Sequence, residues 1–454
     1  MTDSLIVSVD IEGQSVDAGT AYFSRRRNAL ATSVRYDEGY LRRKEAFAID
    51  PALALFSGSH QTDGLPGAFT DCSPDRWGKN LIGQKLQAQA LRDGRTPPSF
   101  SDVDFLIGVS DLTRQGALRF RKSADGPYLD PDLTVPKMVE LPRLLRAADK
   151  VAADGDDLTA IKALLDAGSG SLGGARPKAS VRDGDRLLIA KFPHHSDQWD
   201  VMAWEKTALD LAGRAGIEVP GYELLRTAGR NVLVLDRFDR NAGHRIPYIS
   251  AMTLLSGRDG DARDYTELAE TLPEHSSRTS ADLRELWRRI AFSVAIHNTD
   301  DHLRNHGFLR EDVTGWHLSP AFDINPNPNV VEERVTGIGG ARGRGDELTG
   351  LMMYAPTFDL TETDARRVLL EVIDATRDWR RVASANGIDE TEQKRFENAF
   401  DGLRTEMLGV AHSGGAATTQ LTAPAGRQLR VPKGARSGGR FAARSEDEEQ
   451  SPHR

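Results

Sequence analysis

The sequence predicts an α+β protein made of several units in succession. Strand-like alternation occurs in the first 125 residues, a hairpin pattern follows a glycine-rich run near residue 170, and residues 250–410 have mainly helical periodicity. The chain has 454 residues, of which 39% are apolar and 28% are charged. This length and composition support two or three domains, each with its own core.

Composition argues against several classes of protein. Apolar stretches such as residues 290–296 are far shorter than the roughly 20 residues that a membrane span needs. The first four residues have neither a basic region nor an apolar core, which predicts no secretory signal. The single cysteine, Cys72, fits a reducing compartment, so we expect a cytoplasmic protein without a membrane partner. With 67 acidic and 59 basic side chains the net charge is −8, which disfavours nucleic-acid binding over the whole surface.

Residues 1–125 are expected to form the first α+β unit. Strands are predicted at residues 4–10, 20–23 and 47–49, and the residues from Gly58 to Gly67 have the composition of a turn. A helix is predicted after Pro74, followed by a short helix from Asp102 and a strand at residues 116–120. A segment rich in proline and aspartate, residues 125–136, then marks a boundary.

The second unit is predicted at residues 137–245, the third at 246–411, and a tail at 412–454. The second combines two helices, a hairpin, a third helix and a buried strand, at residues 139–151, 157–167, 179–192, 199–213 and 231–238. The third is mainly helical, with an amphipathic helix around residues 283–294. The tail is expected to be disordered because it is poor in apolar residues, and its basic part, residues 427–444, is either solvated or in contact with nucleic acid or an acidic partner.

The first segment with chemical potential is the glycine-rich run at residues 168–178. Glycines allow backbone N–H groups to approach phosphate oxygens closely. The run follows a predicted helix and precedes a predicted hairpin, which is unlike a dinucleotide-binding loop, and Pro177 before Lys178 is unlike a Walker loop. A loop that closes over a nucleotide from a sheet, as in kinases, remains, and so does a flexible linker.

The second segment is an apolar strand, residues 187–193, that contains Lys191. A lysine within such a strand needs an anionic partner if it is buried. Nucleotide phosphates would serve, with Glu205 on the next helix as the partner within the protein, as in protein kinases. The alternative is an edge-strand lysine that faces solvent.

The third segment, residues 297–306, is a polar cluster after the amphipathic helix. Phosphoryl transfer needs a carboxylate to accept a proton, and an amide oxygen with a second carboxylate to hold Mg²⁺. Asp300, Asn305 and, further on, Asp323 supply this set with the spacing of a kinase loop. A rival interpretation is a transition-metal site for hydrolysis, formed by His297, Asp300, Asp301, His302 and His306.

Together these segments resemble the HipA family, the serine/threonine kinase toxins of bacterial type II toxin–antitoxin pairs. The resemblance covers about residues 1–400. In the N-terminal unit it depends on Pro-Asp-Arg-Trp-Gly at residues 74–78 and its preceding string from Leu65, and on Gly-Ala-Leu from Gly116. In the remainder it depends on residues 171–178, 189–193, 235–240 and 298–305.

The resemblance implies a protein-kinase-like bilobal fold, with a β-containing N-lobe, a mainly α-helical C-lobe and an extra N-terminal α+β subdomain. It also implies ATP and Mg²⁺ as cofactors. Asp300 would be the catalytic base and His302 would support the phosphates, while Asn305 and Asp323 would hold the metal. The nucleotide would be bound by Ser171, Gly173, Gly174, Ala175, Lys178, Lys191, Asp236 and Phe238, the last two from a hinge segment that meets the adenine through its backbone.

The resemblance further implies regulation and partners. Ser171 stands where the family has a loop serine whose autophosphorylation silences the kinase. The expected function is phosphorylation of a host protein, with an aminoacyl-tRNA synthetase as the family precedent, which would inhibit growth. A HipB-like helix-turn-helix antitoxin would neutralise the chain and connect it to operator DNA. The alternatives are a kinase for a lipid or small molecule, and a non-catalytic ATP-binding regulator in an antitoxin–DNA complex.

Two features depart from the family pattern. Asp301 adds a carboxylate next to the expected catalytic base, and it either binds metal or faces solvent. The segment at residues 337–345 contains five glycines and two arginines, which predicts mobility and a place for an acidic or phosphorylated partner.

Overall fold

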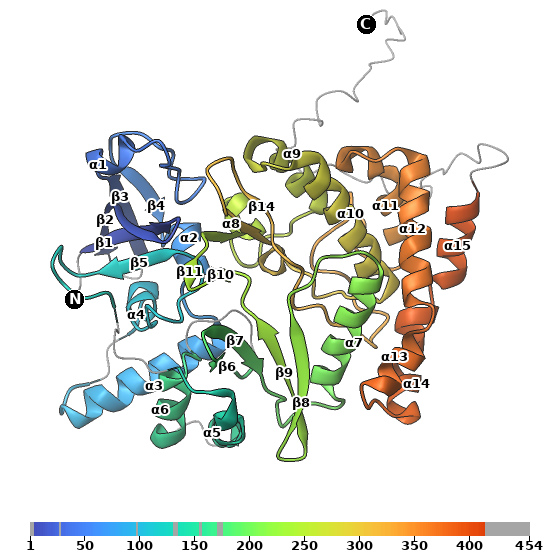
Figure 1. Ribbon diagram of the computed structural model, residues 1–454, viewed down its shortest axis with the longest axis horizontal. Helices are drawn as coiled ribbons and strands as arrows, with labels where there is room; N and C mark the ends of the chain where they lie inside the picture. The colour runs from blue at the N-terminus through green and yellow to red at the C-terminus, as the bar shows by residue number, and fades with distance from the viewer. Residues whose placement is uncertain are drawn as a thin grey trace, which may run out of the picture.

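The computed structural model describes residues 4–26, 29–96, 99–129, 135–153, 157–169 and 176–413. Figure 1 shows a blue sheet at the N-terminal end of the chain, a green sheet in the middle and a group of helices on the opposite side. Ser171, Gly173, Gly174 and Ala175 lie outside the described residues, as does the chain after Ser413. In the described part of the chain, no helix is both long and apolar enough to cross a membrane.

The N-terminal sheet is antiparallel and has the strand order β4-β3-β2-β1-β5. Its strands are β1 (Ser4–Ile11), β2 (Gln14–Arg26), β3 (Ala29–Tyr36), β4 (His60–Asp63) and β5 (Leu118–Arg121). The turn between β1 and β2 consists of Glu12 and Gly13, both with positive φ (49° and 80°), as a two-residue hairpin requires. The alternating apolar residues of β1, Leu5, Val7 and Val9, are all fully buried.

Two predictions for this unit are wrong. Residues 47–49 do not form a strand, because tyrosine side chains replace a partner strand: the backbone N–H of Phe47 donates to the Tyr40 hydroxyl (3.2 Å) and that of Ile49 to the Tyr36 hydroxyl (3.1 Å). The turn predicted between Gly58 and Gly67 contains strand β4, which pairs with β3. The helices of the unit are α1 (Glu38–Leu41), α2 (Gly67–Asp71), α3 (Arg76–Arg92) and α4 (Asp102–Ile107).

Helix α3 connects the first unit to the second. It begins after its N-cap Asp75, whose carboxylate accepts the Gly78 N–H (2.6 Å). Its buried residues Trp77, Leu81 and Ile82 share a hydrophobic core with helices α5 (Leu141–Ala153) and α6 (Leu158–Asp166) and with the middle sheet. Figure 1 shows α3 beside these helices. The N-terminal unit is therefore joined to the second by a common core.

The middle sheet is antiparallel with the order β6-β7-β9-β8. Its strands are β6 (Lys178–Asp183), β7 (Arg186–Lys191), β8 (Tyr222–Thr227) and β9 (Arg230–Asp236), and a short 3₁₀ helix (Met138–Glu140) precedes α5. The predicted hairpin is present, with Lys178 opposite Lys191 in its register. Strand β8 was not predicted from the sequence. Its buried and exposed positions do not alternate regularly, so it lacks the pattern by which a half-buried strand is recognised.

Helix α7 (Val201–Arg214) packs between this sheet and the C-terminal helices, as Figure 1 shows. Trp204 stacks on Phe396 with ring centroids 3.9 Å apart, and its indole N–H donates to Glu392 (2.8 Å). Stacked aromatic pairs stabilise a core beyond the area that they bury. Because α7 also carries Glu205, this packing fixes that carboxylate relative to both lobes.

The third unit is mainly helical, as predicted. Its core helix α10 (Thr279–Ala295) buries Leu286, Trp287 and Ile290 completely. The other helices are α8 (Ala251–Leu254), α9 (Tyr265–His275), α11 (Glu347–Met353), α12 (Glu362–Thr376), α13 (Trp379–Ala385), α14 (Glu390–Asp401) and α15 (Arg404–His412), with 3₁₀ turns at Leu303–Asn305 and Ala355–Phe358. The short strands are β10 (Arg240–Asn241), β11 (His244–Arg245), β12 (Tyr248–Ser250), β13 (Gly307–Leu309) and β14 (His317–Leu318).

The glycine-rich segment at 337–345 is tied to α9. The Asp264 carboxylate accepts the N–H groups of Gly339 (2.9 Å) and Gly340 (2.7 Å). Its arginines are engaged as well: Arg342 donates to the backbone carbonyls of Arg263 and Val335. Composition alone predicts a mobile segment, but its glycines are held by a carboxylate more than 70 positions away in the chain, and Arg342 is held by backbone carbonyls.

Candidate active site

A cavity of about 540 Å³ lies where the middle sheet, the N-terminal unit and the loop between α10 and β13 meet. One wall comes from the middle sheet and the hinge after it, and another from helix α3 and the turn before it. The third comes from the polar loop and the residues that follow β14. Its lining includes Asp75, Arg76, Lys79, Lys178, Lys191, Asp236, Phe238, His302, Arg304, Asn305, Phe322 and Asp323.

Lys191 is bound by two carboxylates in this cavity. Its ammonium lies 2.5 Å from Glu205 Oε1 on α7 and 2.7 Å from Asp323 Oδ1. The ion pair of Lys191 and Glu205 is therefore present as predicted, and the alternative of a lysine facing solvent is wrong. Asp323 has a positive φ of 58°, a left-handed conformation that is uncommon for a residue other than glycine and that aims its side chain at the lysine.

The electrostatics of these groups are mutually dependent. Burial opposes the charged form of Lys191, but the carboxylates of Asp323 and Glu205 overcome it and raise the pKa of the lysine. Burial likewise opposes ionisation of Asp323, yet the charge and hydrogen bond of Lys191 lower the pKa of that carboxyl to about 2. Burial raises the pKa of Glu205, and Lys191 opposes the shift. Asp323 is thus an anion at neutral pH.

The loop after α10 places the other predicted residues at the same cavity. His302 and Asn305 line it, and Asp300 is exposed beside it without lining it. The loop is closed by hydrogen bonds within itself, since the Asp300 carbonyl accepts both the backbone N–H of His302 (3.0 Å) and the side-chain amide of Asn305 (3.3 Å). Desolvation raises the pKa of Asp300, with further contributions from the charges of Asp323 and Glu332 and an opposing one from His302.

The rival transition-metal site is not supported. In the part of the chain that the structure describes, no group of three or more histidine, cysteine, aspartate or glutamate side chains is arranged to hold a metal ion. His297 is buried, with its Nε2 3.2 Å from the Asn329 carbonyl. Asp301 is buried on the side of the loop that faces α9. The five candidate ligands therefore do not converge on one point.

The N-terminal unit supplies part of the cavity, which the sequence did not predict. Lys178 forms an ion pair of 2.8 Å with Asp75, and both side chains are almost fully buried. Burial raises the pKa of Asp75 and lowers that of Lys178, and each charge opposes the shift of the other. Arg76 and Lys79, on the first turn of α3, add cationic groups to the same wall. The sequence signal is the pair Asp75–Arg76 at the start of this helix, which in the sequence supports only the family resemblance.

The hinge differs in detail from the prediction. Asp236 and Phe238 line the cavity, but the Asp236 N–H already donates to the Gly221 carbonyl (2.7 Å) and the Arg237 N–H to the Leu187 carbonyl (3.4 Å). Phe238 packs against Phe322 with ring centroids 5.4 Å apart. The hinge therefore offers an aromatic surface, and two of its three amides are engaged within the protein.

The string Arg-Phe-Asp-Arg at 237–240 joins the hinge to the N-terminal unit. The buried carboxylate of Asp239 accepts hydrogen bonds from Arg237 (2.5 Å), Arg240 (2.9 Å) and the Gly116 N–H (2.7 Å). Despite its burial, the two guanidinium groups hold the pKa of Asp239 far below its usual range. Arg237 also donates to the Thr113 carbonyl (2.7 Å). The string at residues 237–240 therefore holds the hinge and the N-terminal unit together next to the cavity.

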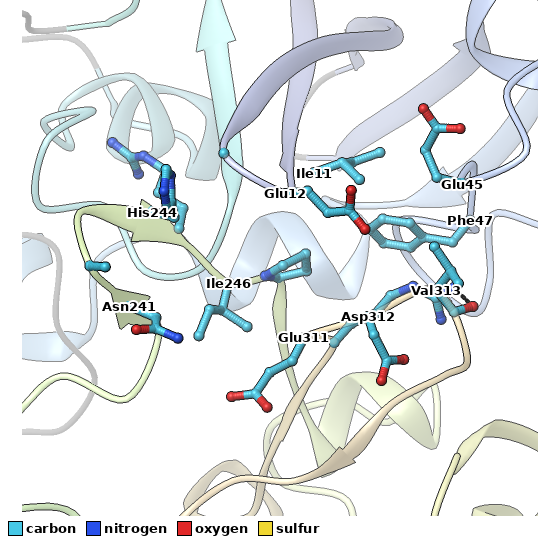
Figure 2. A pocket seen from close by; sticks show the side chains of 15 residues that line it. Ile11, Glu12, Glu45, Phe47, Asn241, His244, Ile246, Glu311, Asp312 and Val313 are labelled. Atoms are coloured by element: carbon cyan, nitrogen blue, oxygen red, sulfur yellow. Dashed lines mark hydrogen bonds between the residues drawn. The ribbon is translucent and has the colours of Figure 1, made fainter.

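A second cavity, of about 310 Å³, lies outside this site (Figure 2). It is formed by the β1–β2 turn, the coil at Phe47, the β10–β11 hairpin and the connection between β13 and β14. Figure 2 shows Ile11 and Ile246 on different sides of this cavity, together with the carboxylates of Glu12 and Asp312. None of the residues predicted from the sequence for catalysis or cofactor binding lines it.

The four-stranded sheet with α7, the mainly helical second lobe and the lysine–carboxylate cluster between them define a protein of the protein-kinase-like bilobal class, with an extra N-terminal α+β subdomain. A family model described as "HipA-like C-terminal domain" matches residues 170–401. The chain belongs to the HipA family.

Individual relatives are distant. The chain is 26% identical over 144 residues to the "Putative kinase" of Haemophilus influenzae. This match covers 28% of this chain and 42% of the relative. It is 25% identical over 277 residues to the toxin YjjJ of Escherichia coli K12, or 58% of this chain and 60% of the relative. The chain thus spans between two fifths and three fifths of these relatives.

Among solved structures, the complex of HipA, HipB and operator DNA from Shewanella oneidensis MR-1 contains a similar chain. The TM-score is 0.59 at 14% sequence identity, and the match covers 90% of this chain and 96% of the other. At this identity the likeness concerns the fold, and it extends over the N-terminal unit as well as both lobes.

Proposed function

We propose that the protein is an ATP- and Mg²⁺-dependent kinase that phosphorylates serine or threonine in a host protein. The observation that carries the proposal is the position of Lys191, which lies within 2.7 Å of both Glu205 and Asp323 in a cavity large enough for a nucleotide. Phosphoryl transfer depends on such a cluster because it positions the phosphates and offsets their charge. The name of the relative from Haemophilus influenzae, "Putative kinase", agrees with a kinase, and the name of the relative from Escherichia coli agrees with a toxin.

The residues present fit the cofactors. Asp323 is ionised at neutral pH, and the Oδ1 of Asn305 accepts no hydrogen bond from a described residue while its amide donates to Asp300. Hard oxygen ligands of this kind suit Mg²⁺, which would offset the charge of the phosphates when bound. Lys191 and Lys178 would contact the phosphates, Phe238 would pack on the base, and Ser171, Gly173, Gly174 and Ala175 would cover the nucleotide.

Asp300 is proposed as the base. Its carboxylate would accept the proton of the attacking hydroxyl, a task for which an exposed position beside the cavity is suitable. His302, on the cavity lining, would support the phosphates. The pKa of Asp300 is raised, so the carboxylate is a better proton acceptor than an ordinary aspartate.

The partners are proposed by analogy with the family. A HipB-like helix-turn-helix antitoxin would neutralise the kinase and recruit it to operator DNA, as the composition of the Shewanella oneidensis complex suggests. The substrate would be a protein of the host cell, for which an aminoacyl-tRNA synthetase is the first candidate to test. Autophosphorylation of Ser171 would add nearly two negative charges where the phosphates of ATP bind and would therefore silence the enzyme.

Peptide-mapping mass spectrometry of the purified chain, before and after incubation with Mg²⁺ and ATP, tests the proposal. We expect phosphate on Ser171 in the wild type and none in Asp300→Asn, a nearly isosteric change. Transfer to a lipid or small molecule, without any protein phosphate, would identify the small-molecule kinase instead. ATP binding without transfer to any acceptor, combined with intact operator repression, would identify a non-catalytic regulator.

A further inference from the structure

The residue next to the proposed base has a different environment and, we propose, a separate role. The structure assigns Asp301 as a positioning residue, which holds the loop that carries Asp300 through contacts with α9 and with the segment before residue 337. The inference rests on the proposed function, because the role is defined by the reaction that Asp300 would perform.

The first step of the argument is the direction of the side chain. Asp300 is exposed on the cavity side, whereas Asp301 is only 7% exposed and faces the interior. Asp301 Oδ2 accepts the hydroxyl of the fully buried Tyr265 at 2.6 Å. Its Oδ1 lies 3.1 Å from Nε2 of the buried His306. Asp301 therefore neither faces solvent nor lines the cavity. From its buried position the side chain cannot reach a substrate.

The second step is that the backbone of Asp301 is held as well as its side chain. Its carbonyl accepts the Thr336 hydroxyl at 2.7 Å and the Tyr265 hydroxyl at 3.2 Å. Two positions before Asp301, the Thr299 carbonyl accepts the Val335 N–H at 2.9 Å. Asp300 is thus flanked by two residues whose carbonyls are fixed from the interior side, and its own carbonyl is fixed by Asn305.

The third step is the source of these contacts. Tyr265 is the first residue of α9 and follows Asp264, whose carboxylate binds Gly339 and Gly340. The Tyr265 N–H also donates to the Gly337 carbonyl at 2.9 Å. The start of α9 therefore holds both the loop of the proposed base and the glycine-rich segment. Asp301 is the residue of the loop that the start of α9 contacts.

The electrostatics agree with this geometry. Burial opposes ionisation of Asp301, but the charge of His306 and the hydrogen bond from Tyr265 overcome it and lower the pKa of the carboxyl. Moving a buried carboxylate away from these partners costs free energy, because its charge would then be buried without hydrogen bonds. A base that moves by about 1 Å can lose roughly a hundredfold in rate, so loss of the Asp301 contacts should change the rate of transfer.

The test compares phosphate transfer from [γ-³²P]ATP, at saturating Mg²⁺ and ATP, in the full-length wild type, Asp301→Asn and Tyr265→Phe. Each rate is divided by the concentration of nucleotide-binding sites in the same sample. We expect the rate per site to fall roughly 10- to 100-fold in Asp301→Asn and less in Tyr265→Phe, with the KM for ATP unchanged in both. Matched controls are Asp374→Asn and Tyr22→Phe, whose side chains are exposed and do not line the cavity.

A rate per site equal to that of the wild type in both variants would contradict the inference. So would a raised KM with an unchanged rate, because the defect would then concern nucleotide binding. If Asp301→Asn fails to fold, Tyr265→Phe decides the matter, since it removes one hydroxyl and keeps the carboxylate. A wild type that binds ATP and transfers no phosphate would instead overturn the proposed function, and this inference with it.

Discussion

The two sides of the loop between α10 and β13 differ in what surrounds their carboxylates. On the cavity side, Asp300 is exposed and its pKa is raised by desolvation and by neighbouring carboxylates. On the interior side, Asp301 is buried and its pKa is lowered because His306 and Tyr265 outweigh the cost of burial. Two adjacent residues of one type thus differ in their electrostatics because Asp300 is exposed and Asp301 is buried against fixed partners.

The largest expected effect is on the cavity side, at Lys191. Replacing it in Lys191→Met leaves Glu205 buried without its cation, and breaking a buried ion pair typically costs about 3–5 kcal/mol. We expect the free energy of unfolding, measured with urea, to fall by a large part of this amount and phosphate transfer to be lost. In the double variant with Glu205→Gln the stability should largely return while the transfer does not. Equal stability of the single and double variants would contradict a coupled pair.

The free energy of unfolding as a function of pH distinguishes Asp300 from Asp301. The pKa of Asp301 is lowered in the folded state, so its ionised carboxylate stabilises the fold above the ordinary value of 3.8, and this contribution is lost as the pH falls through and below that value. Asp301→Asn should therefore be less stable than the wild type at pH 7, with a difference that shrinks in acid.

Asp300 should behave with the opposite sign. Its pKa is raised above 3.8, so ionisation costs stability at neutral pH and this cost disappears as the pH falls through the folded-state value. Asp300→Asn should thus be at least as stable as the wild type at pH 7 and should converge with it in acid. Urea unfolding from pH 7 down to about pH 2 measures both variants, and the same sign for the two would contradict the assigned environments.

The smallest expected effect concerns Thr336, which donates to the Asp301 carbonyl from the interior side. Thr336→Val keeps the shape and removes one hydrogen bond, so the expected loss is about 1 kcal/mol of unfolding free energy, with a modest decrease in the rate of transfer. Thr363→Val, at an exposed position on α12, is the control. A change in the affinity for ATP would show that the contact affects the cavity rather than the loop.

The sequence could predict those parts of the site whose residues lie in short segments with a recognisable pattern, and not the contacts between distant segments. Lys191 in an apolar strand, Glu205 on the next helix, and the spacing of Asp300, Asn305 and Asp323 follow the order of kinase parts, and the structure brings all of them to one cavity or beside it. The pairing of Asp75 with Lys178 could not be predicted, because the two residues are far apart in the chain and join different units.

The same reasoning applies to the fold. The amphipathic helix around residues 283–294 has a strong local pattern and was predicted correctly, as α10. Residues 47–49 had the composition of a strand, but two tyrosine hydroxyls bind their backbone, a tertiary contact without a local signal. Strands of two or three residues, such as β11 and β14, are too short for any alternation to be seen.

The central claim is that the cavity supports phosphoryl transfer with Asp300 as the base. The most direct test measures transfer of the γ-phosphate from Mg²⁺ and ATP in a single turnover, with nucleotide binding measured on the same samples of wild type and Asp300→Asn. We expect transfer by the wild type, a loss of roughly a hundredfold or more in the variant, and equal affinity for ATP in both. Transfer at the same rate in both proteins would contradict the role of Asp300, and ATP binding without transfer by the wild type would contradict the claim as a whole.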